Sequence, residues 1–244
     1  MRKDRLASLL LLGLGIWAAV VYAAVATIVV LGEKDPDKRA IVLMGGALLA
    51  IWALAGGLLM RWQRDRFVRL VRRVRLGWRT RFVLLCIVMA LLEEAVTTGL
   101  SNASGLFGGV TPAARITASR NYLEVVLLHS VIVFVPMFIC WGWMVGRWAF
   151  SPAEVMLLFG LTGWLAELVT FGPHNIGMIG MWVYVYGLMV YLPACTVPAE
   201  RKARPVRWWH WPLAVVLPFA FGVPFVPVVL LVRWACARFG LVAG

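Results

Sequence analysis

Residues 82–100 read FVLLCIVMALLEEAVTTGL, an apolar run of 19 residues that contains two adjacent carboxylates. A helix of this length, at about 1.5 Å per residue, spans roughly the 30 Å hydrocarbon core of a bilayer. In lipid the backbone must satisfy its own hydrogen bonds, so the run predicts a transmembrane helix. Acidic side chains are costly inside such a helix, and those that occur there usually have a function.

The whole chain is as rich in apolar residues as a membrane protein. Hydrophobic residues make up 62% of the 244 residues, charged residues make up 14%, and the mean hydropathy is +0.87. Soluble globular domains are far less apolar. We therefore predict an all-α, polytopic transmembrane helical bundle that forms one integral membrane domain over residues 1–244. Its six or seven spans come from the apolar runs 6–31, 40–60, 82–100, 122–146, 152–171, 176–196 and 212–232.

Basic residues indicate the orientation. Segment 61–81 contains nine arginines and one aspartate, and short loops this basic remain on the cytoplasmic side. The N-terminus is then cytoplasmic, as expected for an integral protein of the plasma (inner) membrane. The last run leaves two alternatives open, because three prolines could fold it into a re-entrant hairpin instead of a seventh crossing. These prolines are Pro218, Pro224 and Pro227.

The same basic segment has an apolar stripe. Phe67, Leu70, Val71, Val74 and Trp78 recur at helical spacing between the arginines, which predicts an interfacial amphipathic helix. Each basic residue near an anionic leaflet contributes about 1 kcal/mol to membrane binding. In spite of the net charge of +13, we expect the partners to be the lipid bilayer and its anionic headgroups, and not nucleic acid.

A polar site is predicted within the apolar spans. Counting along the helices places Glu93 about 13 Å, His129 about 10 Å and Glu167 about 8 Å from the outer edge of the hydrocarbon core. Thr97 follows Glu93 by one helical turn and extends its polar face. The site therefore lies in the outer half of the membrane. Its main groups are Glu93, Glu94 and His129, with Glu167 and Thr97 as binding or relay groups.

Local spacing refines this site. Gly160 and Gly163 share a helical face with Glu167, and such a small-residue face lets a neighbouring helix approach and turns Glu167 into the bundle. Glu124 precedes His129 by five residues. On an α-helix these two side chains point about 140° apart, so we expect Glu124 to be peripheral.

The turn between the fifth and sixth spans contributes two further candidates. It reads TFGPHNIG over residues 170–177, and its His174 and Asn175 are either exposed loop residues or additional binding or relay groups. The E-x-x-H spacing of di-iron bundles is missing, since Glu124 and His129 stand in E-x-x-x-x-H. Metal binding therefore ranks lowest, and we expect no metal and no cofactor.

Glu93 and Glu94, followed one helix later by His129, resemble the motifs of the CPBP intramembrane proteases, a family that includes CAAX prenyl proteases and bacteriocin-processing enzymes. That family has the motifs E-E-x-x-x-R, F-x-x-x-H and H-x-x-x-N or H-x-x-x-D. The resemblance implies a metal-independent intramembrane peptidase whose substrate is a peptide or a membrane protein. In such an enzyme Glu93 or Glu94 would activate water as a general base, and His129 would polarise the carbonyl group.

Three positions depart from these motifs. Thr98 stands at the arginine position, Val125 at the phenylalanine position, and Met178 four residues after His174. The sequence leaves two other classes of function open. Paired carboxyl groups in a membrane suit a proton- or cation-coupled transporter, in which titration is the function. The same carboxyl groups could also fix helix packing in a non-catalytic membrane scaffold.

Overall fold

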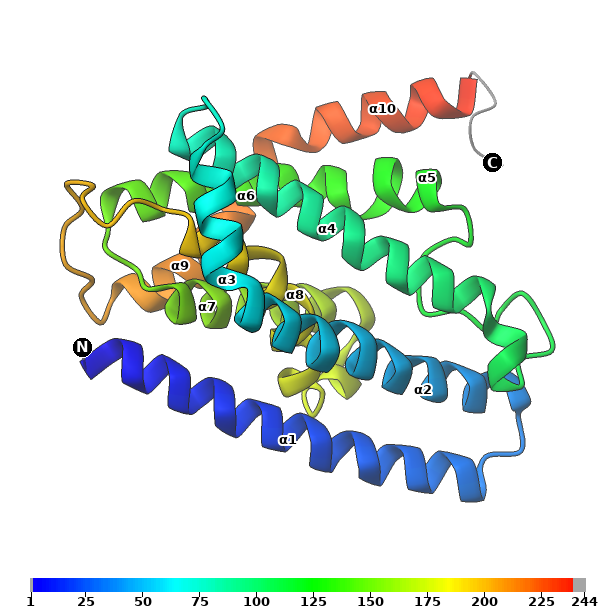
Figure 1. The fold of residues 1–244 in the computed structure, drawn as a ribbon. Coiled ribbons are helices and arrows are strands. Elements are labelled where there is room, and N and C mark those ends of the chain that lie inside the picture. The colour runs from blue at the N-terminus through cyan, green and yellow to red at the C-terminus, as the bar shows by residue number, and fades with distance from the viewer. Residues whose placement is uncertain (1, 239–244) are drawn as a thin grey trace.

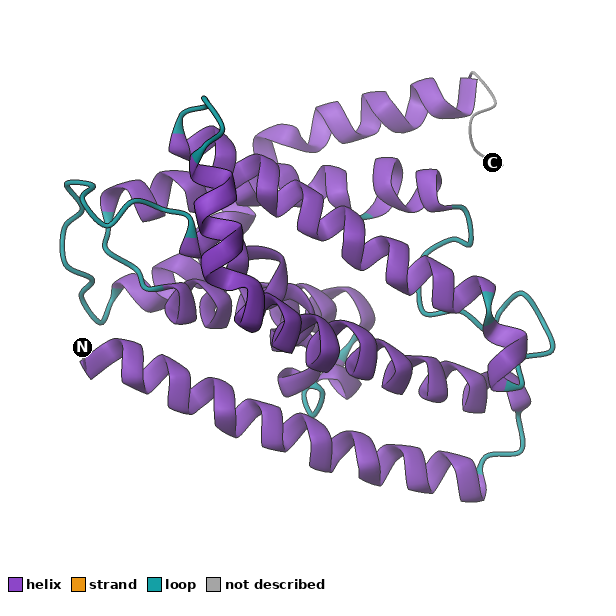
Figure 2. Ribbon diagram, viewed as in Figure 1, coloured by secondary structure: helices purple, strands orange, loops and turns teal. Residues whose placement is uncertain are grey.

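The computed structural model describes residues 2–238, and it folds as a bundle of helices (Figure 1). Figure 2 shows that helices and connecting loops account for these residues; over the described range no strand forms, and the only β-type pairing is an isolated bridge between Trp148 and Arg204. The all-α prediction is confirmed.

The seven predicted apolar runs correspond to helices. The longer helices are α1 (Arg2–Gly32), α2 (Pro36–Leu48), α3 (Gly57–Arg72), α4 (Trp78–Asn102), α6 (Val131–Arg147), α7 (Pro152–Phe171), α8 (Ile179–Cys195), α9 (His210–Gly222) and α10 (Val226–Arg238). Shorter elements are the π-helices η1 (Leu49–Gly56) and η3 (Val125–His129), the 3-10 turns η2 (Ser104–Phe107), η4 (Pro173–Asn175) and η5 (Val223–Phe225), and α5 (Tyr122–Glu124).

Five helical runs between residues 2 and 238 are long and apolar enough to cross a membrane. A sixth is obtained if the bent pair Tyr122–His129 and Val131–Arg147 counts as one span. The apolar helix α8 is shorter, at 17 residues, because the turn that precedes it extends to Met178. The chain is therefore a multi-pass helical membrane protein.

The last apolar run does not fold as a hairpin. Residues His210–Cys236 form one helical run of 27 residues through all three prolines, a length of about 40 Å at 1.5 Å per residue. Neighbouring helices and local 3-10 geometry let a transmembrane helix accommodate proline, and η5 supplies such geometry here. This length is sufficient for a crossing of the membrane, as an alternative to a re-entrant loop.

The amphipathic segment forms the end of a longer helix. Helices α2, η1 and α3 run continuously from Pro36 to Arg72 over 37 residues, since neither proline nor a loop interrupts them. Val71 is buried and Phe67 packs against the core, while the intervening arginines are exposed. The chain then turns, and α4 begins at Trp78.

Helices α7 and α8 approach each other closely along a glycine face. A Cβ atom added at Gly160 would lie 2.4 Å from the carbonyl oxygen of Val183, and one added at Gly163 would lie 2.2 Å from the ring of Tyr186. Only glycine leaves room for this backbone approach. The close contact fixes α8 against α7 at the level of Tyr186.

The basic loops gather at one end of the bundle. The amide of Arg204 donates to the carbonyl of Arg147 at 2.9 Å, and Arg201 Nε donates to the carbonyl of Val145 at 2.7 Å. The guanidinium of Arg79 lies directly against Gly146. We call this the basic end, formed by segments 72–81, 145–151 and 196–209.

Two other loops, 33–35 and 103–121, meet at the opposite end, whereas the turn between α7 and α8 lies against the middle of α1, where Trp17 Nε1 donates to the Gly177 carbonyl at 2.8 Å. Asp37, in the first turn of α2, accepts hydrogen bonds from the amides of Val110 and Thr111 at 2.7 and 3.1 Å. In the same loop, the guanidinium of Arg120 donates to the Ser104 hydroxyl at 2.6 Å. The 103–121 loop is thus tied to the start of the second apolar helix.

Candidate functional site

The two adjacent glutamates of α4 face the interior of the bundle. Glu93 is 4% exposed and Glu94 is 8% exposed. The next polar residues of the helix are buried as well, and the Thr97 hydroxyl lies 3.3 Å from the Glu94 carboxylate oxygen Oε2. The hydroxyl of buried Thr98 has no hydrogen-bond partner among residues 2–238. Helix α4 therefore presents a polar face to its neighbours and not to lipid.

Glu167 of α7 faces the same region. Its carboxylate accepts a hydrogen bond from the hydroxyl of Tyr186 on α8. Glu167 interacts electrostatically with Glu93 and Glu94, and Tyr186 interacts with all three glutamates. We call Glu93, Glu94, Glu167 and Tyr186 the carboxyl cluster. Three helices build it, and the glycine face of α7 allows Tyr186 to reach Glu167.

The carboxyl cluster has no cationic partner within the described part of the chain. The ion pairs found there are Lys38–Glu33, Arg64–Asp65 and His129–Glu124. Three neighbouring carboxyl groups without a counter-ion cannot readily be ionised together, because burial and mutual repulsion both oppose the second and third charge. The cluster is thus a place where protons can be held and exchanged.

Within residues 2–238, no group of three His, Cys, Asp or Glu side chains is placed to bind one metal ion. The carboxyl groups extend from α4 to α7 and end at a phenol on α8. Their arrangement resembles a chain more than a coordination cage.

An aromatic layer closes the cluster on the side of the basic end. The Phe134 ring packs on Tyr186, with ring centroids 5.6 Å apart, and also contacts Phe138 and Phe159. The rings of Phe138 and Phe159 are 5.4 Å apart, and both side chains are buried. Along their helices, these two residues lie nearer the basic end than the cluster does. Three rings therefore separate the carboxyl groups from that end.

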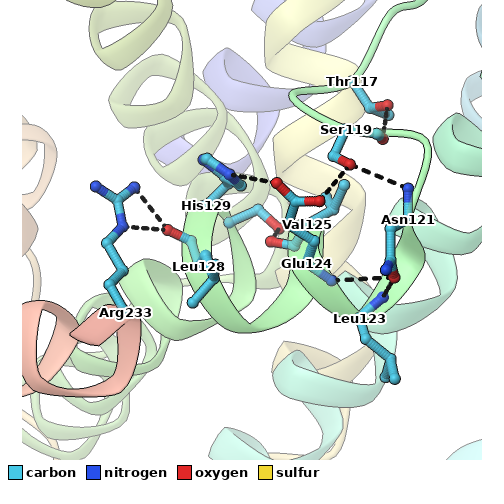
Figure 3. A network of polar contacts seen from close by, with 10 residues as sticks. Thr117, Ser119, Asn121, Leu123, Glu124, Val125, Leu128, His129 and Arg233 are labelled. Carbon is cyan, nitrogen blue, oxygen red and sulfur yellow. Dashed lines mark hydrogen bonds and ion pairs between the residues drawn. The ribbon is translucent and has the colours of Figure 1, made fainter. Parts of the chain in front are cut away.

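His129 has a different partner from the one expected. Its Nε2 atom lies 3.8 Å from Glu124 Oε1, and Ser119 donates to the other Glu124 oxygen at 2.7 Å (Figure 3). The expectation that Glu124 points away from His129 is wrong, because residues Val125–His129 form a π-helix. A π-helix closes i→i+5 hydrogen bonds, and the Ser130 amide donates to Val125 in this way at 3.0 Å. Residues five apart then lie above one another.

The π-helix ends in a break beside the cluster. The segments Tyr122–His129 and Val131–Arg147 meet at an angle of 49°, with Ser130 at the junction. The Leu128 carbonyl accepts hydrogen bonds from Arg233 of α10, at 3.0 Å from Nε and 2.7 Å from Nη2 (Figure 3). The Ser130 hydroxyl donates to the Val125 carbonyl at 3.2 Å and lies near enough to the Glu94 carboxylate to interact with it. The broken helix therefore brings Ser130, and not His129, to the carboxyl cluster.

The turn between α7 and α8 is held by its asparagine. Asn175 is buried, its side-chain oxygen accepts from Trp182 Nε1 at 3.0 Å, and its carbonyl accepts from Trp164 Nε1 at 3.0 Å. The exposed His174 lies 3.3 Å from the Asn175 amide nitrogen. The Trp182 ring also contacts that of Tyr186 at 5.8 Å. Asn175 thus fixes the turn, and one aromatic contact links the turn to the cluster.

Sequence reasoning missed two members of this site. Tyr186 could have been found as a phenol inside an apolar run, since a buried phenol hydroxyl usually has a hydrogen-bond partner. Ser130 follows His129 directly, but only the break in the helix turns it toward Glu94. Comparison with protein-family models, with curated proteins and with solved structures finds no match.

Proposed function

We propose that the protein is a proton-coupled membrane transporter whose carboxyl cluster takes up and releases protons. The observation that carries this proposal is the gathering of Glu93, Glu94, Glu167 and Tyr186 inside the bundle without a cation among the described residues. Ionisable residues inside a membrane domain commonly form proton relays. Here titration of the carboxyl groups is itself the function.

Hydroxyl groups lie at two of the carboxyl groups. Thr97 contacts Glu94, Ser130 contacts the same carboxylate, and Tyr186 donates to Glu167. A hydroxyl can donate one hydrogen bond and accept another, so each of these side chains can pass on a proton. In the proposed cycle, a proton moves between the Glu93–Glu94 pair and Glu167, with the Tyr186 hydroxyl at the far end.

Two further features suit a transporter. The site of many secondary transporters is built by discontinuous helices, and the break at Ser130 lies against Glu94. The aromatic layer around Phe134 would act as the seal toward the basic end, which the positive-inside rule assigns to the cytoplasm. Opening this layer would expose the cluster to that side.

The second candidate is the intramembrane peptidase that the CPBP resemblance implies. The burial of the adjacent Glu93 and Glu94 favours it, because a desolvated carboxyl group can serve as a general base near neutral pH. In this alternative His129, whose contact is with Glu124, would have to change partner, or Tyr186 would supply the hydrogen bond to the carbonyl.

Proton binding is tested with purified protein in vesicles. Infrared difference spectra recorded across a pH step report protonated carboxyl groups, and a trapped pH dye reports proton flux under an imposed membrane potential. We expect the Glu167→Gln variant and the Glu93→Gln, Glu94→Gln double variant to lose carboxyl signal and flux. The matched control is Glu124→Gln, which removes an acid outside the cluster and should keep the flux.

The same preparation separates the candidates. Cleavage of a transmembrane peptide without an imposed gradient, abolished by the double variant, would favour the peptidase. Equal carboxyl signals and flux in the parent and all variants would overturn the transporter proposal. A loss of folding in the double variant would instead favour the scaffold.

A further inference from the structure

Two adjoining cavities lie at the basic end, and no residue of the carboxyl cluster lines either of them. One has a volume of about 260 Å³ and the other about 350 Å³, close to the lower limit of about 300 Å³ for small-molecule sites. Arg147 and Arg204 line both cavities. The first is also lined by Arg79 and Lys202, and the second by Arg207.

The backbone holds these cations in place. Arg147 and Arg204 come from segments more than fifty residues apart, and an isolated parallel bridge joins the segments. In this bridge the Arg204 amide donates to Arg147 at 2.9 Å, and the Ala149 amide donates to Arg204 at 2.8 Å. Arg79 reaches the same place because Gly146 has no side chain. Three segments of the basic end, 72–81, 145–151 and 196–209, therefore bring their cations together.

The cavity walls combine charge with indole rings. The Arg147 guanidinium lies over the Trp143 ring at 5.8 Å, and the Arg79 guanidinium lies over Trp78 at 5.2 Å. Trp143 is 41% exposed, and indole rings beside basic residues are typical of the membrane interface. This combination is what we expect of a cavity at the level of lipid headgroups.

No acidic side chain balances these cations within residues 2–238. The ion pairs there involve other residues, and none of the five cavity cations takes part. Converging like charges repel, and a phosphate relieves the repulsion because guanidinium groups bind its oxygens through charge-assisted, often bidentate, hydrogen bonds.

We propose that this basic cavity binds the phosphate of an anionic glycerophospholipid headgroup, with Arg147 and Arg204 as the central ligands and Arg79 and Lys202 on the rim. A lipid is favoured over a soluble phosphate because the cavity lies where the apolar helices α6 and α9 end or begin. The acyl chains could then remain in the bilayer beside these helices.

Lipid retention tests the proposal. The full chain is reconstituted in vesicles of phosphatidylcholine, with or without phosphatidylglycerol, then extracted into detergent and examined by native mass spectrometry. The Arg147→Gln, Arg204→Gln double variant should retain phosphatidylglycerol about tenfold less than the parent, as expected from the loss of charged hydrogen bonds. Its backbone bridge does not depend on the side chains.

The matched control is the Arg66→Gln, Arg69→Gln double variant. Both residues are exposed on α3 and line neither cavity, so the control removes the same charge and should retain the lipid as the parent does. Equal losses in the two double variants would mean diffuse attraction to the leaflet and would overturn the proposal. Displacement of phosphatidylglycerol by inorganic phosphate would assign the cavity to a soluble anion and would overturn the lipid ligand.

A third variant keeps every charge. A Cβ atom at Gly146 would lie 2.9 Å from Arg79 Nη2, so Gly146→Ala must displace that guanidinium. We expect it to reduce phosphatidylglycerol retention while leaving the net charge unchanged. Should the first double variant fail to fold, unchanged retention in Gly146→Ala would still count against the site.

Discussion

Glu124 and His129 are five residues apart in the chain, yet their side chains meet, with 3.8 Å between Glu124 Oε1 and His129 Nε2. A π-helical turn makes this contact, and the same turn ends in the break at Ser130 that brings a hydroxyl to the carboxyl cluster. One local departure from α-helical geometry thus separates His129 from Glu94 and sets the composition of the cluster.

His129 is therefore expected to be dispensable for proton uptake. The His129→Gln variant loses a partly exposed contact with Glu124, which is an ion pair only when the imidazole is protonated, and such exposed pairs contribute about 0–1 kcal/mol to stability. Thermal unfolding in detergent should show little change, and the infrared carboxyl signal should persist. If the protein is instead a peptidase that uses His129, this variant should lose peptide cleavage. Such a loss would favour the peptidase.

Arg233 is expected to stabilise the broken helix. Its two donors satisfy the Leu128 carbonyl, and their loss in Arg233→Leu should lower the free energy of unfolding by about 1–3 kcal/mol. The measurement is thermal unfolding in detergent. Arg238→Leu removes the same charge from the same helix and serves as the control, because the Arg238 guanidinium lies over the Trp234 ring at 5.7 Å and makes no hydrogen bond to the described residues. Equal stability of the two variants would show that the Leu128 contact contributes nothing.

The glutamate pair is expected to be functional and not structural. Glu93→Gln, Glu94→Gln keeps the side-chain shape and removes the cost of a buried charge, so the double variant should unfold at or above the parent's temperature. A structural role predicts a loss of about 1–3 kcal/mol, because an amide donates where a carboxylate only accepts. A large drop in melting temperature would therefore contradict both the transporter proposal and the peptidase proposal.

Glu94 and Glu167 are expected to crosslink when both are replaced by cysteine. The two glutamates interact electrostatically, so a short bifunctional thiol reagent should join positions 94 and 167 in a background without the native cysteines. A pair at positions 124 and 167 provides the comparison and should react less. If positions 124 and 167 crosslink more readily than positions 94 and 167, then Glu94 and Glu167 do not belong to one cluster.

Arg72 and Gly105 are expected to label from opposite sides of the membrane. Both positions are exposed, one in the basic end and the other in the 103–121 loop, and nine arginines in segment 61–81 are difficult to translocate. A cysteine at position 105 should react with an impermeant reagent added to intact cells, whereas one at position 72 should react only after permeabilisation. Labelling of both in intact cells would contradict the orientation.

The sequence alone was sufficient to predict the class of fold and the helices. The free energy of transferring a segment into lipid depends on the residues of that segment alone, so the length of an apolar run can be read from the local sequence. For the runs 82–100 and 152–171, the predicted ends lie within a few residues of the ends of α4 and α7. The inward polar face of α4 was also predictable, because Glu93, Glu94 and Thr97 follow the α-helical period.

Tertiary structure decided the partners of these residues. The α-helical period failed between Glu124 and His129 because the π-helix inserts an extra residue into the turn, and the compensating contact comes from Arg233, more than a hundred residues away. Tyr186 reaches Glu167 only because α8 packs against the bare backbone at Gly163. Each of these outcomes is set by contacts between segments distant in sequence, whereas hydropathy and periodicity describe one segment at a time.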